Sequence, residues 1–399
     1  MKIRRYNSSQ PKIRRYKKIY RKTNTKVIGT AIFVVALVVV FFLSWSLYRP
    51  IIDFFSGNLS SQEESSEQSS QQSSVSSKPE VVITPPQVDD TDAIRAVYMP
   101  IDMLYDSTTL NNFLDSLNEN KYNYIMLDMK TADGNLTYTS SLKEVQGTSV
   151  VMTDAISNMP DTVALLRARG FGIIAKIHVF RDPIGSRSDY DKAIHYLDSE
   201  LFWLDNTKEK GGKTWLNPCS QKARDYVVSI AEEVAQMGVD IILFDDIRFP
   251  NKLGFAYADC GVEVTLENKD EYLNQFIVQA TETLSSYDVE LYFSSPANAT
   301  VSEVTFPYGT LPVLLAKDGY APTLYAADYN SELPSYTAVE EQLKKLAKYI
   351  DSETAPAFLP ILDASKGYDD AARQISVLTQ NNYNSYILYS ENGNYGFAN

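Results

Sequence analysis

The feature that most restricts the fold of this 399-residue chain is an alternation of short apolar segments with longer amphipathic segments from residue 93 onward. The apolar segments are hydrophobic on both faces, as parallel strands covered by helices are. We predict strands at 94–101, 122–129, 172–180, 239–244, 289–294, 321–325, 357–362 and 385–389. We predict helices at 109–119, 159–169, 221–237, 272–285, 338–350 and 369–379, two of which are followed closely by the stop signals Gly170 and Gly238.

Eight strands separated by helices predict an α/β fold, specifically a (β/α)8 TIM barrel over residues 92–399. An open, doubly wound sheet is the competing interpretation. It has less support because no glycine-rich phosphate loop follows the first strand. The sequence stops ten residues after the last predicted strand, which leaves no room for a full final helix.

The segment that precedes this domain predicts a membrane anchor. Residues 27–48 are apolar and uncharged, and at 1.5 Å per residue about 20 helical residues cross a bilayer core. Residues 1–26 carry eleven Lys and Arg and no acid, which predicts a cytoplasmic N-terminus and an extracellular C-terminal domain. A cleaved signal peptide is the alternative, although its apolar run is usually shorter. Residues 49–91, rich in Ser and Gln and then containing prolines, predict a flexible linker.

Charge and composition exclude several classes of function for the outer domain. The chain has 37 basic and 50 acidic residues, and removing the 13 basic and 4 acidic ones up to residue 78 leaves a net charge of −22. Nucleic acid is therefore not expected as a partner. The few cysteines and histidines, Cys219, Cys260, His178 and His195, predict no zinc site, and no cofactor is expected. One disulfide and a carboxylate-bound hard cation stay open as alternatives.

Polar residues at the predicted strand ends are candidates for the active site, because parallel strands of a barrel place their carboxyl ends at one mouth. These residues are Asp102 after the first strand, Asp128 and Lys130 at the second, Arg181 and Asp182 after the third, Asp245, Asp246 and Arg248 at the fourth, Asp328 after the sixth, Asp363 after the seventh and Glu391 after the eighth. Trp215 and Tyr325 add flat faces that suit sugar rings, although aromatic side chains are more often simply packed.

The fourth strand, which ends in Asp245 and Asp246, contributes the most candidates. Neighbouring residues on a strand point to opposite faces, so these two acids are not expected to act as an acid and base pair. The partner of Asp245 should come from another strand. An ion pair between Asp245 and Arg248 that closes the barrel rim is the competing structural interpretation. Asp128 and Lys130 share parity and should point the same way, either to an interior salt bridge or to substrate.

Five motifs resemble those of a bacterial glycoside hydrolase-type family with a TIM-barrel domain, found in envelope proteins. They read VYMPIDMLY, LDMKTADGNLTYTS, GIIAKIHVFRDP, WLNP and FDDIRFP, and the resemblance covers roughly residues 93–395. The last four motifs match the family's VIDVKDD-x-G, ARIVVFKDP, W-[LV]-[DN]-P and FDYVRFP patterns in order and at similar spacing. The resemblance implies site residues at the matching positions, namely Asp128, Lys130, Lys176 (in place of Arg), Arg181, Asp182, Trp215, Asn217, Asp245, Arg248, Tyr325 and Asp363.

One departure concerns the fifth strand, which commonly ends in an acid in the family. Here residues 292–296 read YFSSP and contain none. A general acid would then come from Asp246, Asp328, Asp363 or Glu391.

The resemblance therefore implies a membrane-anchored glycoside hydrolase that cleaves an envelope or extracellular polysaccharide. Asp245 is expected to be nucleophile or charge stabiliser, oriented by Arg248, with Asp246, Asp363 and Glu391 as further catalytic candidates. The remaining candidates, Asp128, Lys130, Lys176, Arg181, Trp215, Asn217, Tyr325 and Asp328, are expected to bind substrate. A catalytically inactive glycan-binding or envelope-assembly module is the main alternative, and a structural ectodomain without an open cleft is a third. No pattern indicates an oligomeric state.

Overall fold

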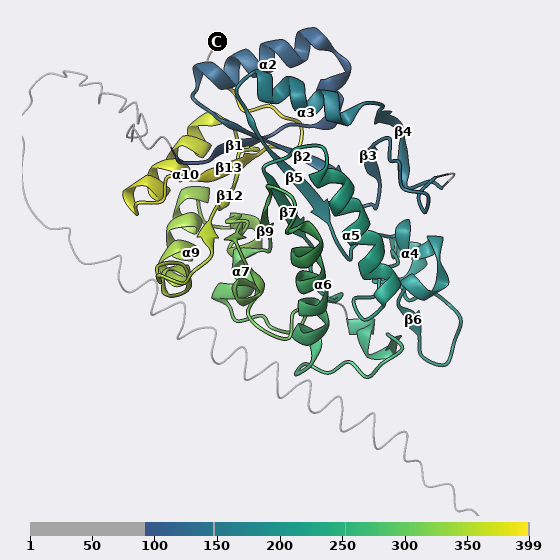
Figure 1. Cartoon of the computed structure of the whole chain (residues 1–399). Coiled ribbons are helices and arrows are strands. Elements are labelled where there is room, and N and C mark those ends of the chain that lie inside the picture. Colours follow the sequence, from purple (N-terminus) through teal and green to yellow (C-terminus); the bar gives the residue numbers. More distant parts are fainter. Residues whose placement is uncertain (1–91, 147, 252, 398–399) are drawn as a thin grey trace, which may run out of the picture. The chain divides into compact units, whose positions relative to one another are not determined.

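A parallel sheet that curls on itself lies at the centre of the domain that the structure describes (Figure 1). The computed structural model describes residues 92–146, 148–251 and 253–397. The predicted cytoplasmic tail, transmembrane segment and linker, residues 1–91, lie outside the described residues. None of the helices in the described part of the chain has the length and hydrophobicity to cross a membrane.

The central strands are all parallel, and hydrogen-bonded neighbours follow the order β11-β10-β9-β7-β5-β2-β1-β13-β12. Their bounds are β1 Arg95–Tyr98, β2 Tyr124–Lys130, β5 Gly172–His178, β7 Ile241–Asp245, β9 Glu290–Phe293, β10 Gly319–Tyr320, β11 Ala357–Phe358, β12 Ile361–Asp363 and β13 Tyr386–Tyr389. The predicted α/β class is thus confirmed, as a curled parallel sheet of TIM-barrel type.

The strands bury side chains on both faces, as their continuous apolar sequences predicted. The inner face forms a small core to which strands all around the sheet contribute, from Ala96, Tyr98, Met126, Ile174, Ile241, Leu243, Tyr292, Ala321, Leu359, Ile361 and Ile387. The outer face packs a larger core against the helices. Polar side chains on the inner face are consequently confined to the strand ends, which is where the candidate site lies.

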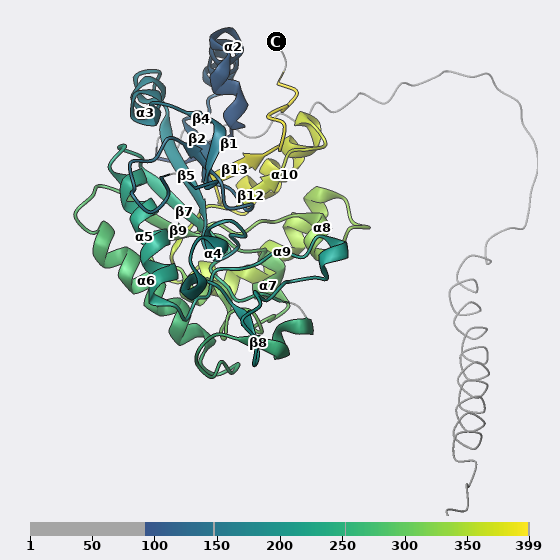
Figure 2. The same ribbon diagram turned by 90° about the vertical axis from the view of Figure 1, so that its right-hand side faces the viewer.

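Helices cover the outside of this sheet (Figures 1 and 2). The long ones are α2 Ser107–Glu119, α3 Met159–Ala168, α5 Gln221–Ala235, α6 Lys269–Leu284, α9 Ser335–Ile350 and α10 Tyr368–Gln380, so all six predicted helices are present. Asp106, Asn158 and Ser220 cap α2, α3 and α5 by accepting a bond from a first-turn amide. Gly170 and Gly238 follow α3 and α5 with φ of 93° and 81°, so both predicted stop signals are confirmed.

The sixth and seventh strands differ from prediction because proline interrupts each of them. The predicted strand at 321–325 is replaced by β10, which ends at Tyr320, followed by a single bridging residue, Thr323. Pro322 has no N–H to donate to a neighbouring strand. Pro360 likewise separates β11 from β12.

Several shorter elements occupy long loops that the hydrophobic pattern did not resolve. They are β3 Leu136–Tyr138, β4 Val151–Ile156, α4 Gly185–Ser188, β6 His195–Tyr196, β8 Ala258–Asp259, α7 Ala297–Val301 and α8 Ala326–Tyr329. The β6 and β8 strands pair in antiparallel fashion, which holds the loop after β5 against the loop after β7. Both loops contribute residues to the candidate site described next.

Candidate active site

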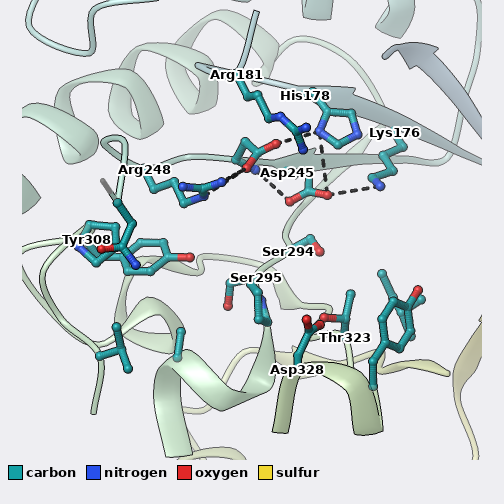
Figure 3. Close-up of a pocket in the computed structure, with 18 of the residues that line it drawn as sticks. Lys176, His178, Arg181, Asp245, Arg248, Ser294, Ser295, Tyr308, Thr323 and Asp328 are labelled. Carbon is teal, nitrogen blue, oxygen red and sulfur yellow. Dashed lines mark hydrogen bonds and ion pairs between the residues drawn. The ribbon is translucent and has the colours of Figure 1, made fainter. Parts of the chain in front are cut away.

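A cavity of about 610 Å³ lies at the carboxyl ends of the strands (Figure 3). Its lining includes Met126, Lys176, His178, Arg181, Asp205, Trp215, Asp245, Asp246, Arg248, Asn251, Ser294, Ser295, Tyr308, Thr323, Tyr325, Asp328 and Tyr389. This is the position at which barrel enzymes carry their active sites. An open cleft is therefore present, contrary to the expectation for a purely structural ectodomain.

Asp245, the last residue of β7, forms an ion pair with Lys176 of β5, with Lys176 Nζ 3.1 Å from Asp245 Oδ2. Burial acts to lower the pKa of Lys176, but the carboxylates of Asp245 and Asp128 hold that pKa above its ordinary value. The ammonium group therefore stays charged and offsets the charge of Asp245. Arg248 does not contact Asp245 in this way, so the predicted Asp245–Arg248 pair is wrong.

Asp246 is the partner of Arg248, whose Nη2 and Nε lie 2.8 and 3.0 Å from Asp246 Oδ1. His178 Nδ1 lies 2.9 Å from Asp246 Oδ2 and 3.9 Å from Asp245 Oδ2. Burial acts to raise the pKa of Asp246, but the charges of Arg248 and Arg181 and the hydrogen bond with His178 hold it well below the usual range. Asp246 is accordingly an ionised group that anchors two neighbours.

The backbone at Asp246 explains why two consecutive acids face one cavity. The strand ends at Asp245, and Asp246 adopts a left-handed conformation with φ of 56°. Its amide donates to Asp245 Oδ1 at 2.7 Å. Strict alternation predicted opposite faces for the two side chains, and that prediction is wrong because the strand has already ended. Asp and Asn tolerate the left-handed region better than most side chains.

Trp215 supports this side of the cavity from the loop after β5. The Arg248 guanidinium carbon lies 4.8 Å from the centre of the Trp215 ring, in a cation–π contact. Trp215 Nε1 donates to Asp205 Oδ2 at 3.2 Å. Because Trp215 is only 3% exposed, it serves mainly to position Arg248 and offers little open face to a sugar.

The opposite side of the cavity carries hydroxyl groups and one acid, Asp328, as Figure 3 shows. Burial raises the pKa of Asp328, which extends from α8, while Thr323 acts in the other direction. Ser294 is 2% exposed, and its Oγ has no hydrogen-bond partner among the described residues. Ser295 differs, because its Oγ lies 2.9 Å from the Tyr320 hydroxyl.

The structure brings eight of the predicted site residues to this cavity, namely Lys176, Arg181, Trp215, Asp245, Asp246, Arg248, Tyr325 and Asp328. It places the other seven candidates outside the lining, namely Asp102, Asp128, Lys130, Asp182, Asn217, Asp363 and Glu391.

Asp128 and Lys130 point in different directions because a β-bulge separates them. Asp128 is in register with Lys176, whereas Lys130 is in register with Ile177. Asp128 accepts a bond from the Tyr98 hydroxyl at 3.1 Å, and the fully buried Lys130 pairs with Asp182 at 2.9 Å. The shared orientation predicted from parity is therefore wrong, and Lys130 forms the buried salt bridge of the alternative interpretation with a different acid.

Asn217 and Asp363, two further candidates outside the lining, bond to nearby backbone groups. Asn217 is buried and links two loops, since its Nδ2 donates to the Cys260 carbonyl and its Oδ1 accepts from the Cys219 amide. Asp363 accepts from the Ser365 amide, and Glu391 is exposed. The catalytic roles assigned to Asp363 and Glu391 stay predictions.

One cluster offers ligand atoms of the kind that metals bind. His178, Asp245 and Asp246 each place one such atom within 4.8 Å of the others. Lys176 and Arg248 already neutralise the two carboxylates, however, and a divalent cation there would meet both positive charges. The donor set therefore suits ion pairing better than metal coordination.

Sequence reasoning missed His178, Ser294 and Thr323 as lining residues. His178 could have been found, because it follows Lys176 by two positions on the same strand and so shares its face. The two hydroxyl residues carry no such signal, since Ser and Thr are common in every loop.

The model of a family described as "Putative glycosyl hydrolase domain" matches residues 96–305, more than half of the chain. The chain belongs to this family. Membership confirms the resemblance found in the motifs. A search of curated proteins gave no match.

Solved structures provide a second comparison. The glycoside hydrolase domain of PgaB (BpsB) from Bordetella bronchiseptica is similar to this chain, with 16% identity and a TM-score of 0.57, over 75% of this chain and 95% of that one. At this identity the likeness establishes a shared fold. The glycoside hydrolase domain of PelA from Pseudomonas aeruginosa matches at 12% identity and a TM-score of 0.42, over 76% of this chain and 96% of that one, which is too remote to argue from.

Proposed function

We propose that this protein is a membrane-anchored, extracytoplasmic glycoside hydrolase that cleaves a polysaccharide of the cell envelope or its surroundings. The observation that carries the proposal is the position of two carboxyl groups, Asp245 and Asp328, on opposite sides of one cavity at the strand ends (Figure 3). Glycoside hydrolysis uses such a pair on either side of the scissile bond.

The two carboxyl groups are suited to different steps. Its raised pKa keeps a proton on Asp328 to higher pH, so Asp328 would donate that proton to the glycosidic oxygen as the bond to the anomeric carbon breaks. Asp245 would either attack the anomeric carbon or stabilise the positive charge that develops there. The adjacent Lys176 fixes Asp245 in place.

Two architectural elements complete the proposal. We propose that the curled sheet is a full eightfold barrel, supported by the stretch that contains β11 and β12, which pairs with β10 on one side and β13 on the other. The basic residues 1–26 and the apolar residues 27–48 support an anchored topology. A linker of about 40 residues has an r.m.s. reach of roughly 30–40 Å, so the substrate would lie close to the membrane.

Asp245→Asn and Asp328→Asn test the assignment against a panel of cell-wall and extracellular polysaccharides, with reducing-end release as the measurement. Each change should lower the rate by about 10³-fold or more, because each removes one essential group. Glu353→Gln is the matched control, since it neutralises an exposed acid outside the cavity and should leave the rate unchanged. A full rate in Asp245→Asn would overturn the assignment.

A second candidate function is glycan binding without turnover. It is favoured by the absence of an acid at the end of β9, where Ser294 and Ser295 stand. Binding of a polysaccharide that the wild-type protein never shortens, under conditions in which Asp328→Asn binds it equally well, would favour this candidate.

A further inference from the structure

Arg181 differs from the other cations of the cavity in having no acid bound to it. Lys176 pairs with Asp245, and Arg248 pairs with Asp246. Among the described residues, no carboxylate lies within ion-pair distance of Arg181 and no hydrogen bond of its side chain is found. Its guanidinium group nevertheless lines the cavity, beside His178 in Figure 3.

The acids that share the cavity with Arg181 are engaged elsewhere. Asp246 is close enough for Arg181 to contribute to the lowering of its pKa, but Arg248 and His178 hold the Asp246 oxygens. Asp205 accepts from the Trp215 ring and from the backbone of Lys213, at 3.2 and 2.9 Å.

Asp328, the remaining acid, lies across the cavity, and burial favours its protonated form. The charge on Arg181 is thus left without a bound counter-ion.

A second observation indicates that the cavity is completed by a polar ligand. Ser294 Oγ is buried and has no partner in the described part of the chain, although a buried hydroxyl is normally hydrogen-bonded. Leaving such a group unpaired costs free energy, and rotation of the Ser294 side chain toward the cavity that it lines would let a bound molecule supply the missing partner. Arg181 and Ser294 therefore supply one unpaired charged donor and one unpaired neutral group to the same cavity.

We propose that Arg181 binds an anionic substituent of the glycan, a carboxylate or a phosphate, so that the substrate is an acidic polysaccharide. This inference rests on the proposed function, in that it takes the ligand of the cavity to be a glycan. The guanidinium group offers a planar fork of donors that matches either anion in a bidentate manner. Because the outer domain has a net charge of −22, the attraction is local to the cavity and not a property of the whole surface.

Three hexasaccharides test the proposal by calorimetric titration of the full chain at pH 7. One contains glucuronate, the second is its carboxyl-reduced neutral counterpart, and the third carries sugar 6-phosphates. The wild-type protein should bind at least one charged oligosaccharide about tenfold more tightly than the neutral one, as expected for a charge-assisted bidentate contact. The tighter of the two charged probes identifies the anion.

Variants assign this preference to Arg181. Arg181→Gln should reduce the preference to within about twofold while leaving neutral binding unchanged, and Arg181→Lys should retain part of it. Arg187→Gln is the matched control, because it removes the same charge from an exposed position outside the cavity and should change nothing.

Equal affinity of the wild-type protein for charged and neutral oligosaccharides, or no binding of any of them, would overturn the proposal. Equal weakening of charged and neutral binding in Arg181→Gln would also overturn it, since that result would reveal a purely structural role. Product analysis on the same samples separates the two claims. Arg181-dependent binding of an acidic glycan that is never cleaved would contradict hydrolysis alone, and cleavage restricted to neutral glycans would contradict the anion site alone.

Discussion

The two sides of the cavity are built on opposite principles. One side, the charged wall, includes Lys176, His178, Asp245, Asp246 and Arg248, whose groups already bind one another. Arg181 lies beside them and is the exception, because it has no bound counter-ion among the described residues. The other, the hydroxyl wall, consists of Ser294, Ser295, Thr323 and Asp328, where one hydroxyl lacks a partner and the acid tends to keep its proton.

The ion pairs make the charged wall rigid before a ligand binds, whereas Ser294 on the hydroxyl wall is still unpaired. On the charged wall, ion pairs already hold the side chains in place, so little free energy is spent on reorganising them when a substrate binds. Such preorganisation is a main source of transition-state stabilisation. On the hydroxyl wall, the Ser294 hydroxyl has no partner among the described residues and would gain one only when a ligand binds. Substitutions should therefore affect stability on the first wall and ligand binding or proton transfer on the second.

The largest contrast should appear in the free energy of unfolding. Asp246→Asn removes the charge shared by Arg248 and His178, and it should cost about 2–3 kcal/mol because it leaves a largely buried cation uncompensated. Asp328→Asn, the same chemical change on the hydroxyl wall, should alter stability by less than about 0.5 kcal/mol. Urea denaturation of the two variants measures both values, and equal costs would remove the distinction between the walls.

The next effect concerns the pH dependence of activity. If Asp328 is the general acid, its raised pKa allows the protonated form to persist above the usual range of an aspartate, and the rate then falls about tenfold per pH unit as pH rises beyond that pKa. A kcat/KM profile of the wild-type protein on any cleaved glycan shows this limb. If the residual activity of Asp328→Asn still showed the same fall in kcat/KM at high pH, that fall would belong to the titration of another group.

Ser294→Ala should have the smallest effect of the three substitutions, and it should change stability and glycan affinity differently. Removing an unpaired buried hydroxyl should leave the free energy of unfolding unchanged or raise it by up to about 1 kcal/mol. Glycan affinity should fall about fivefold as a hydrogen bond to the ligand is lost. Thermal unfolding and titration of the same variant measure the two quantities, and loss of both together would show that the hydroxyl has a structural partner.

Much of the fold was predictable because hydrophobic period and stop signals act locally. The helices that end before Gly170 and Gly238 are examples, since a residue with positive φ ends a helix whatever surrounds it. The sixth strand was misplaced because Pro322 limits pairing in a way that a count of apolar residues ignores. The loop elements β6 and β8 depend on contacts between distant segments, which no local pattern carries.

At the site, sequence reasoning found the residues but not their partners. Asp245, Asp246 and Arg248 were recognised from one motif, yet the assumed pair was wrong because side-chain alternation fails at the residue that follows the strand. Lys130 was expected to bind substrate because it matches the family motif, and its expected alignment with Asp128 fails because a β-bulge lies between the two residues. A β-bulge or a left-handed residue shifts the alternation of side-chain direction along a strand by one residue. Nothing in the local composition indicates where this occurs.

The left-handed backbone at Asp246 also limits what substitution can achieve there. Two independent requirements, the backbone conformation and the charge of the side chain, restrict the residue type at this position. The backbone accepts Gly, Asn and Asp most readily, while the Arg248 guanidinium and the His178 ring nitrogen require a carboxylate, which only Asp and Glu supply. Aspartate is the sole member of both sets, so a saturation library at this codon should yield a single fully functional residue, and no conservative replacement exists.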